Sequence, residues 1–312
     1  MNNKKKHQTV LLKETIQSLK IKKNGIYVDG TFGEGGHSIK ILEKLGENGT
    51  LYAIDQDPEA IKIAKKITDH RFHIIHGNFA EIDLFFKKNK IKKKIDGIIL
   101  DLGVSTMQIM SKKRGFSFNL DGPLDMRMNP KIGISASKWI NQEKINKIYK
   151  VLKYFGEEKF SKRIAEAIKK TRKKKPIITT LELSNLIKSH IPWEKRHKHP
   201  ATKSFQAIRI FINQEINLLK IFLDKILKFL NYKGRISIIS FHSLEDRLVK
   251  QFMIKNSKNP HFLNKIPLKE NEILQLYQKK LKIIHRIFPT KKEIINNPRS
   301  RSAILRTAEL KN

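Results

Sequence analysis

Four short apolar runs in the first hundred residues, each followed by an acidic or glycine-containing turn, constrain the fold more than any other feature. These runs span 25–30, 49–55, 71–75 and 96–101. Between them, 38–46 and 58–67 have the apolar spacing of amphipathic helices, the first ending at a glycine and the second opening at a proline. Continuous apolar strands that alternate with helices are typical of a parallel sheet covered on both faces. The sequence therefore predicts an α/β fold.

A long interruption separates these runs from the rest of the predicted sheet. The next buried strand is at 235–240, far beyond the dozen or so residues that a crossover needs. The intervening chain is mostly helix-like, with the better segments at 139–152, 156–170 and 180–190. We interpret 107–204 as an inserted helical domain that contacts an RNA substrate, and 1–106 together with 205–312 as the core.

The C-terminal third returns to the sheet pattern. A long amphipathic helix is expected over 205–230, and Ser243 is expected to cap a helix after the strand at 235–240. Two further strands, at 282–288 and 302–308, predict an antiparallel hairpin that ends an otherwise parallel sheet.

The charge of the chain points to a polyanionic partner. Lys and Arg number 65 against 29 Asp and Glu, a net charge of +36, which favours nucleic acid through counterion release. Only 13 of the 65 are arginine, a pattern that suits a drift of solvated positions toward lysine as well as it suits a binding surface. The chain has no cysteine, which excludes disulfides and thiolate sites, and no apolar run near the ~18 residues of a membrane span. We expect a cytoplasmic protein without a membrane partner.

The ends of the predicted strands carry residues suited to a nucleoside. Ligands of open α/β sheets bind beyond the carboxyl ends of the strands. The first strand leads into a glycine-rich loop, where the backbone can approach a ligand closely. The second ends in Asp55, placed to accept both hydroxyls of a ribose; the third leads to Phe79, which can pack on an adenine; the fourth ends in Asp101.

The glycine loop does not match a dinucleotide site. Gly33 and Gly35 are followed by Ser38 where the third glycine of G-x-G-x-x-G belongs. A nucleoside cofactor with a carboxylate and no pyrophosphate fits better, and S-adenosylmethionine has that chemistry.

The chain resembles the ribosomal RNA small subunit methyltransferase H family, also called MraW-type methyltransferases. The matching segments are DGTFGEGGHS at 29–38, DLGVS at 101–105, RGFSF at 114–118, DGPLDMRM at 121–128, HPAT at 199–202, FQAIRI at 205–210, SFHSLEDR at 240–247 and NPRSRSA at 297–303. They occur in the family's order along nearly the whole chain. One departure is Lys203-Ser204, where the family usually has Arg-Thr.

This resemblance implies a class I methyltransferase fold with a helical insertion. It also implies methyl transfer from S-adenosylmethionine to N4 of a cytidine in the decoding region of small-subunit (16S) ribosomal RNA, within the ribosomal subunit. The cofactor contacts that it implies are Gly35, Gly36, His37, Asp55, Phe79, Asp101 and Gln108.

The catalytic role of Asp101 has two interpretations. Its carboxylate could accept a hydrogen bond from N4 of the cytosine, or it could only hold the amino group of the cofactor. The motifs of other N4-cytosine methyltransferases do not decide this, because Leu102-Gly103-Val104 stands where they have Pro-Pro-aromatic. His242 is expected to orient or pack, and no metal ion is required for the chemistry.

Two rival functions remain open. A nicotinamide-dependent oxidoreductase shares the strand–glycine–helix turn and the ribose carboxylate. A non-catalytic RNA-binding assembly factor explains the charge but not the residues at four strand ends. His70, His73 and His76 do not predict a metal site, because positions three apart in a strand point to opposite faces.

Overall fold

The computed structural model describes residues 8–91, 93–192, 199–257 and 280–311. The contacts divide the chain into two compact units. The first, here called the sheet unit, comprises 1–103 and 217–312; the second, the helical unit, comprises 104–216. The insertion was predicted at 107–204, and the helical unit extends further because residues such as Phe205 and Ile208 pack into its core.

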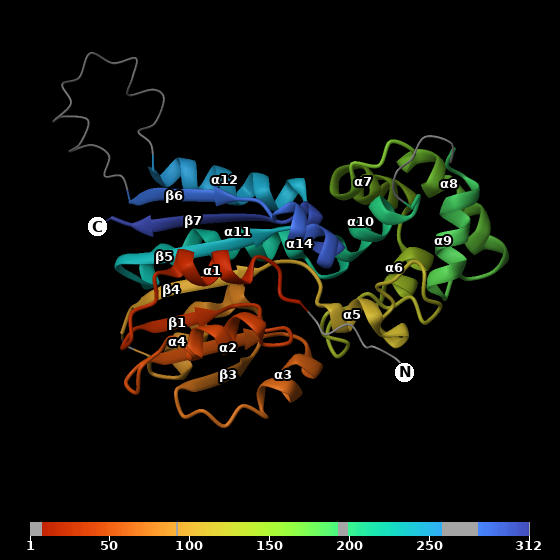
Figure 1. Cartoon of the computed structure of the whole chain (residues 1–312). Helices are drawn as coiled ribbons and strands as arrows, with labels where there is room; N and C mark the ends of the chain where they lie inside the picture. The colour runs from red at the N-terminus through yellow and green to blue at the C-terminus, as the bar shows by residue number, and fades with distance from the viewer. Residues whose placement is uncertain (1–7, 92, 193–198, 258–279, 312) are drawn as a thin grey trace, which may run out of the picture. The chain divides into compact units, whose positions relative to one another are not determined.

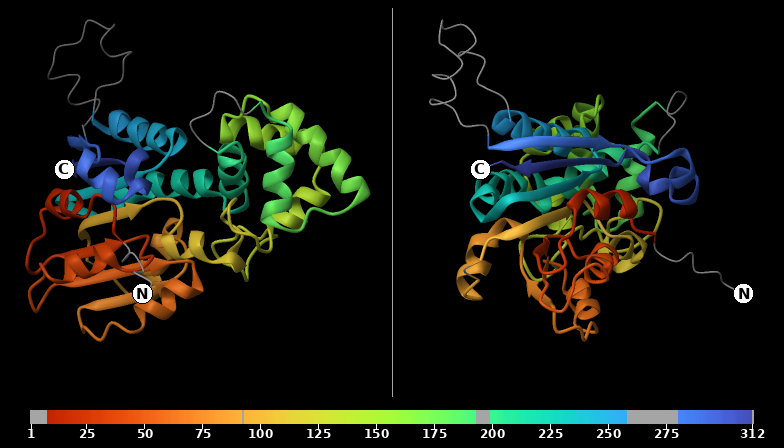
Figure 2. Two further views of the ribbon diagram at one scale, coloured as in Figure 1. Left: turned by 45° about the vertical axis from the view of Figure 1, so that its right-hand side comes forward. Right: turned by 60° about the vertical axis from the view of Figure 1, so that its left-hand side comes forward.

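The sheet unit contains a seven-stranded sheet in the order β3-β2-β1-β4-β5-β7-β6 (Figure 1). Its strands are β1 Ile26–Asp29, β2 Thr50–Asp55, β3 Phe72–His76, β4 Ile95–Asp101, β5 Leu230–Ser240, β6 Leu281–Ile287 and β7 Ile304–Leu310. The first five are parallel, and β7 runs antiparallel to both β5 and β6 (Figure 2). The predicted parallel sheet with a C-terminal antiparallel hairpin is confirmed. The strand order agrees with the class I methyltransferase fold that the resemblance implies.

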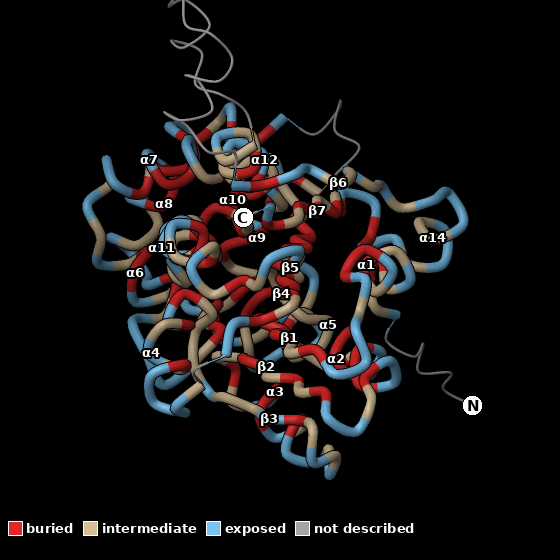
Figure 3. The backbone as a smooth tube through the Cα atoms, turned by 90° about the vertical axis from the view of Figure 1, so that its left-hand side faces the viewer, coloured by how far each residue is buried: buried red, intermediate tan, exposed pale blue. Residues whose placement is uncertain are grey.

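Helices cover both faces of this sheet, as the continuous apolar strands require. One face packs against α1 (Leu12–Leu19), α2 (Gly36–Leu42) and α3 (Pro58–Ala64). The other packs against α4 (Ile82–Lys88), α11 (Glu215–Lys225) and α12 (Ser243–Ser257). Figure 3 shows the buried residues in red along the central strands β1, β4 and β5. Helices α1 and α4 were not predicted from the sequence.

The helical unit has a hydrophobic core of its own, in which Trp139, Leu152, Ile168 and Leu183 are buried. Its helices are α5 Thr106–Met110, α6 Ala136–Gln142, α7 Ile145–Gly156, α8 Ser161–Lys174, α9 Thr180–Ser189 and α10 Thr202–Ile212. None of the helices in the described part of the chain combines the length and the apolar composition that a membrane crossing requires.

Two predicted helices are interrupted. The segment 139–152 forms two helices, because Glu143 and Lys144 adopt extended backbone angles between α6 and α7. The single helix expected over 205–230 ends at Ile212, and Gln214, with φ of 51°, turns the chain before α11 begins. Between β6 and β7 lie α14 (Lys291–Asn296) and the 3₁₀ turn η5 (Pro298–Ser302).

Candidate cofactor and active site

The carboxyl ends of β3, β2, β1 and β4 lie next to one another at one edge of the sheet. Because these four strands are adjacent and parallel, Asp29, Asp55 and Asp101 end their strands at the same edge. Phe79 follows β3 in the 3₁₀ turn η1 (Phe79–Glu81). The topology thus brings Gly35, Asp55, Phe79 and Asp101, predicted from the sequence, to a common edge.

The glycine loop after β1 requires glycine for two different reasons. Gly35 has φ of 83°, in the left-handed region, and its amide donates to the carbonyl oxygen of Phe32 at 2.8 Å. A Cβ on Gly35 would lie 2.7 Å from Cζ of Phe32, and one on Gly36 would collide with Oγ1 of Thr9. The loop is therefore folded tightly against its own phenylalanine, and α2 starts directly after it.

Asp55 is fixed by the backbone on both sides of its carboxylate. Gly33 N–H donates to Oδ2 at 2.7 Å, and Asp57 N–H donates to Oδ1 at 2.8 Å. Burial raises the pKa of Asp55 to about 6, although these two backbone hydrogen bonds lower it. Each carboxylate oxygen keeps acceptor capacity for one more donor, which suits a pair of neighbouring hydroxyls.

Phe79 lies close to the loop that follows β1. A Cβ on Gly30 would lie 3.2 Å from Cβ of Phe79, so the two backbones approach closely. The ring of Phe79 meets Phe222 edge-on, with centroids 5.6 Å apart. Asn78 caps the turn by accepting from Ala80 N–H at 2.9 Å, which fixes the position of Phe79.

Asp101 and His37 form a pair at the carboxyl end of β4. Nε2 of His37 lies 3.7 Å from Oδ2 of Asp101, and the Asp101 amide donates to Oγ1 of Thr31 at 2.6 Å. His37 is 4% exposed, and neither of its ring nitrogens has a hydrogen-bond partner in the described residues. Oδ1 of Asp101 is likewise buried without a partner there. Buried polar atoms are normally satisfied, so this pair fits a polar ligand such as the amino-acid end of S-adenosylmethionine.

Asp29 supports this pair and was not among the predicted site residues. It is 1% exposed and accepts from Ser38 Oγ at 2.6 Å and from Thr31 N–H at 3.1 Å. Burial raises the pKa of Asp29, while the hydrogen bond from Ser38 and the charge of His37 lower it. The sequence signal was an acid at the end of an apolar run, directly before the glycine loop.

Gln108 belongs to the helical unit, where it lies on α5. The side-chain oxygen of Gln108 accepts from the backbone N–H of Ser105 at 3.0 Å, and the backbone N–H of Gln108 donates to Ser105 Oγ at 3.1 Å. This reciprocal cap starts the helix. The contact of Gln108 with the cofactor stays a prediction.

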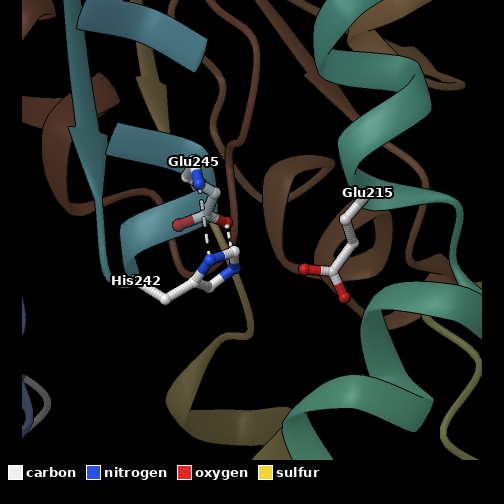
Figure 4. Close-up of side chains that lie close together, drawn as sticks. All are labelled: Glu215, His242 and Glu245. Carbon is white, nitrogen blue, oxygen red and sulfur yellow. Dashed lines mark hydrogen bonds and ion pairs between the residues drawn. The ribbon is translucent and has the colours of Figure 1, made fainter. Parts of the chain in front are cut away.

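The segment after β5 carries a buried His–Glu pair (Figure 4). Glu245, 2% exposed, accepts from Phe241 N–H at 2.9 Å, and its own amide donates to Nδ1 of His242 at 3.4 Å. Nε2 of His242 lies 3.1 Å from Oε1 of Glu245. Since α12 begins at Ser243, the residue before the helix is His242, and the prediction that Ser243 caps it is wrong.

Asp246 on α12 accepts two hydrogen bonds from Arg306 on β7. These bonds connect α12 to the C-terminal hairpin.

The segment 114–128 turns its apolar side chains inward. Phe116, Met126 and Met128 belong to the core of the helical unit. The guanidinium of Arg114 donates to the carbonyl oxygens of Arg127 and Met128, and Arg127 pairs with the carboxylate of Asp125. These contacts hold the segment together from within.

Comparison with known proteins identifies the family. A family model described as the MraW methylase family matches residues 4–311. A ribosomal RNA small subunit methyltransferase H from Buchnera aphidicola subsp. Schizaphis graminum is 58% identical over 311 residues, covering 100% of both chains. A protein of the same name from Hamiltonella defensa is 50% identical and covers 97% of each chain. The chain therefore belongs to the MraW methylase family, and its cofactor is S-adenosylmethionine.

Proposed function

We propose that the protein transfers a methyl group from S-adenosylmethionine to N4 of a cytidine in the decoding region of 16S ribosomal RNA. The relatives that span the full chain are named for methylation of small-subunit ribosomal RNA, and the +36 charge suits an RNA substrate. We further propose that the substrate is the RNA within a small ribosomal subunit in the cytoplasm, and that the helical unit contacts it.

The observation that carries the proposal is the arrangement at the sheet edge. The fixed carboxylate of Asp55, the ring of Phe79 and the unsatisfied His37–Asp101 pair follow adjacent strands. In the proposed arrangement, Asp55 accepts the ribose hydroxyls and Phe79 packs on the adenine. His37 and Asp101 hold the amino-acid end beside the glycine loop.

Methyl transfer depends more on aligning the cytosine N4 with the sulfonium methyl group than on general acid–base catalysis. S-adenosylmethionine supplies a methyl group already activated on its sulfonium. The lone pair of the cytosine N4 is delocalised into the ring, so the amine is a poor nucleophile until a hydrogen-bond acceptor favours a pyramidal nitrogen. We propose Oδ1 of Asp101 as that acceptor, because it is buried without a partner among the described residues, while Oδ2, on the side of His37, serves the amino-acid end. Near-attack alignment can contribute several kcal/mol, and no metal ion is needed.

The target base must leave its stack to reach the site. Enzymes that modify a base hold it outside the duplex or act on an unpaired strand. Unpaired bases are held by stacking on aromatic or arginine planes, with cationic contacts to the flanking phosphates.

The test is to incubate the protein with methyl-labelled S-adenosylmethionine and small ribosomal subunits, then digest the RNA and separate its nucleosides. The proposal expects the label in N4-methylcytidine at one position of the 16S RNA. Label in another nucleoside would overturn the N4 assignment. Absence of label while the RNA is still bound would favour the non-catalytic assembly factor.

A further inference from the structure

Apart from Arg247, the arginine residues in the described part of the chain divide into those with internal partners and those without. Lysine is the common basic residue of this chain, so a position that carries arginine instead points to a contact that lysine cannot make. The planar guanidinium group can bind two oxygens at once. Most arginines in the described part of the chain are held by internal partners: Arg71, Arg114, Arg127, Arg172, Arg209, Arg235 and Arg306. By contrast, Arg286, Arg299 and Arg301 are exposed, and their side chains have no ion pair or hydrogen bond to other described residues. Arg163 on α8 is also exposed, but it lies alone in the other unit.

The segment that carries these arginines is rigidly built. Within the motif at 297–303, the Asn297 side chain donates to the carbonyl oxygen of Gln8 at 2.9 Å. Ser300 is fully buried, and both its amide and its hydroxyl donate to the carbonyl oxygen of Asn297. Arg299 and Arg301, on either side of this serine, are exposed. The polar residues of the motif thus fix a turn that leaves both guanidinium groups in solvent.

The location of the segment follows from the strand directions. Because β7 is antiparallel to both β5 and β6, β6 runs parallel to β5. The carboxyl end of β6 therefore lies at the same edge of the sheet as Asp101, and the connection 288–303 begins there. Figure 1 shows α14 at this edge.

The segment also has an exposed aromatic ring and a predominantly positive charge. The guanidinium carbon of Arg286 lies 4.3 Å from the ring centroid of Phe288, and Phe288 is 51% exposed. Residues 286–303 contain five basic residues and one acid, Glu293. That acid already accepts from Leu11 N–H at 2.8 Å. No carboxylate on this segment is therefore placed to neutralise the arginines.

We propose that Arg286, Phe288, Arg299 and Arg301 form an RNA-binding surface, the arginine patch, at the sheet edge that holds the methyl-transfer site. Arg299 and Arg301 bind backbone phosphates next to the target nucleotide, each guanidinium offering two parallel N–H donors. The Arg286–Phe288 pair provides a plane on which an unpaired base stacks. This inference rests on the proposed function, because it takes ribosomal RNA as the substrate.

The test compares R299A/R301A with the unmodified protein in binding to a 16S RNA fragment across a series of salt concentrations. Each phosphate contact on a single strand contributes about 0.7 to the slope of log K against log salt. The pair should lower the slope by about 1.4 and the affinity on the order of tenfold or more. KM for RNA should rise, while kcat at saturating RNA and the affinity for S-adenosylmethionine stay unchanged.

The matched control is K93A/K94A, which removes two exposed charges directly before β4, at the opposite edge of the same sheet. R299K/R301K keeps the charge and should recover part of the affinity, and R299Q/R301Q replaces the alanine pair if that variant does not fold. If R299A/R301A binds RNA no more weakly than K93A/K94A, the arginine patch is refuted. If the unmodified protein does not methylate ribosomal RNA at all, it is the proposed function that fails.

Discussion

At the scale of single residues, Asp55 is the most constrained part of the proposed cofactor site. Both of its oxygens are oriented by backbone amides before any ligand arrives, so little ordering is left for binding. Its ionised form is the one that accepts hydroxyl groups. Because burial raises its pKa to about 6, the acceptor is lost as the pH falls through that value.

Asp55→Asn should weaken S-adenosylmethionine binding on the order of 10- to 100-fold at pH 7.5, because a hydrogen bond to a charged group contributes about 1.5–3 kcal/mol. The affinity of the unmodified protein should rise between pH 5 and 7.5 as the carboxylate ionises, and that of the variant should rise less. Calorimetry at pH 5, 6 and 7.5 measures both effects. Glu59→Gln, on the exposed side of α3, is the control. Equal affinities for unmodified protein and D55N at pH 7.5 would remove Asp55 from the ribose-binding role.

Gly35→Ala should lower the free energy of unfolding more than Gly133→Ala does. Both glycines have left-handed backbones, with φ of 83° and 73°, for which an alanine costs about 1–2 kcal/mol. Only Gly35 also meets a side chain, since its Cβ would lie 2.7 Å from Phe32, whereas no atom lies within 4 Å at Gly133. Denaturant unfolding measures the free energy of unfolding of both variants. Equal decreases would show that the glycine loop can shift away from the added Cβ at no cost.

The sequence predicted individual site residues where an apolar strand ends in a chemically distinctive residue. Asp55 and Asp101 are visible this way, because a carboxylate that ends a buried run has few structural roles. Asp29 ends its strand in the same way, but its partner Ser38 is nine residues along the chain, and only the folded loop shows their contact. The guanidinium partners of Arg114 could not be predicted, since they are carbonyl oxygens fixed by the loop conformation.

At the scale of secondary-structure elements, the strands were predicted more reliably than the helices. A strand buried on both faces is apolar over most of its length, as at 98–100 in β4, and that signal is independent of neighbouring elements. A helix boundary depends on single backbone angles, and a positive φ at Gln214 has no sequence signature. The predicted helix over 205–230 was therefore wrong as a single element, although both of its parts are helical.

The start of α12 depends on one buried carboxylate. Glu245→Ala removes the buried carboxylate that accepts from the partly buried Phe241 amide, so it should lower the free energy of unfolding by about 1–3 kcal/mol. Lys250→Ala, at an exposed position of the same helix, should change it by no more than about 0.5 kcal/mol. Chemical denaturation measures both variants. A loss no larger for E245A than for K250A would show that solvent replaces the carboxylate.

At the scale of the whole molecule, the two units do not share a hydrophobic core among the described residues. The hydrophobic clusters on the two faces of the sheet hold the strands whose ends carry the proposed cofactor site, and the helical unit has its own core. The net charge of +36 acts over this scale too, by attracting RNA from a distance and making its binding dependent on salt. The composition of the chain predicts affinity for RNA, but it does not locate the residues that contact RNA, because lysine is spread along the entire chain.

Binding of S-adenosylmethionine should stabilise the folded chain by mass action. At a concentration 100 times the dissociation constant, the free energy of unfolding should rise by about 2.7 kcal/mol. NADH at the same concentration should produce no rise, since the glycine loop lacks the third glycine of a dinucleotide site. Thermal denaturation with each compound is the measurement. Stabilisation by NADH and not by S-adenosylmethionine would favour the oxidoreductase.

The most direct measurement is a crystal structure of the protein with S-adenosylhomocysteine. The account predicts the ribose hydroxyls within hydrogen-bond distance of Asp55, the adenine against Phe79, and the amino-acid end beside His37 and Asp101. A ligand bound anywhere other than the carboxyl ends of β1 to β4 would contradict it.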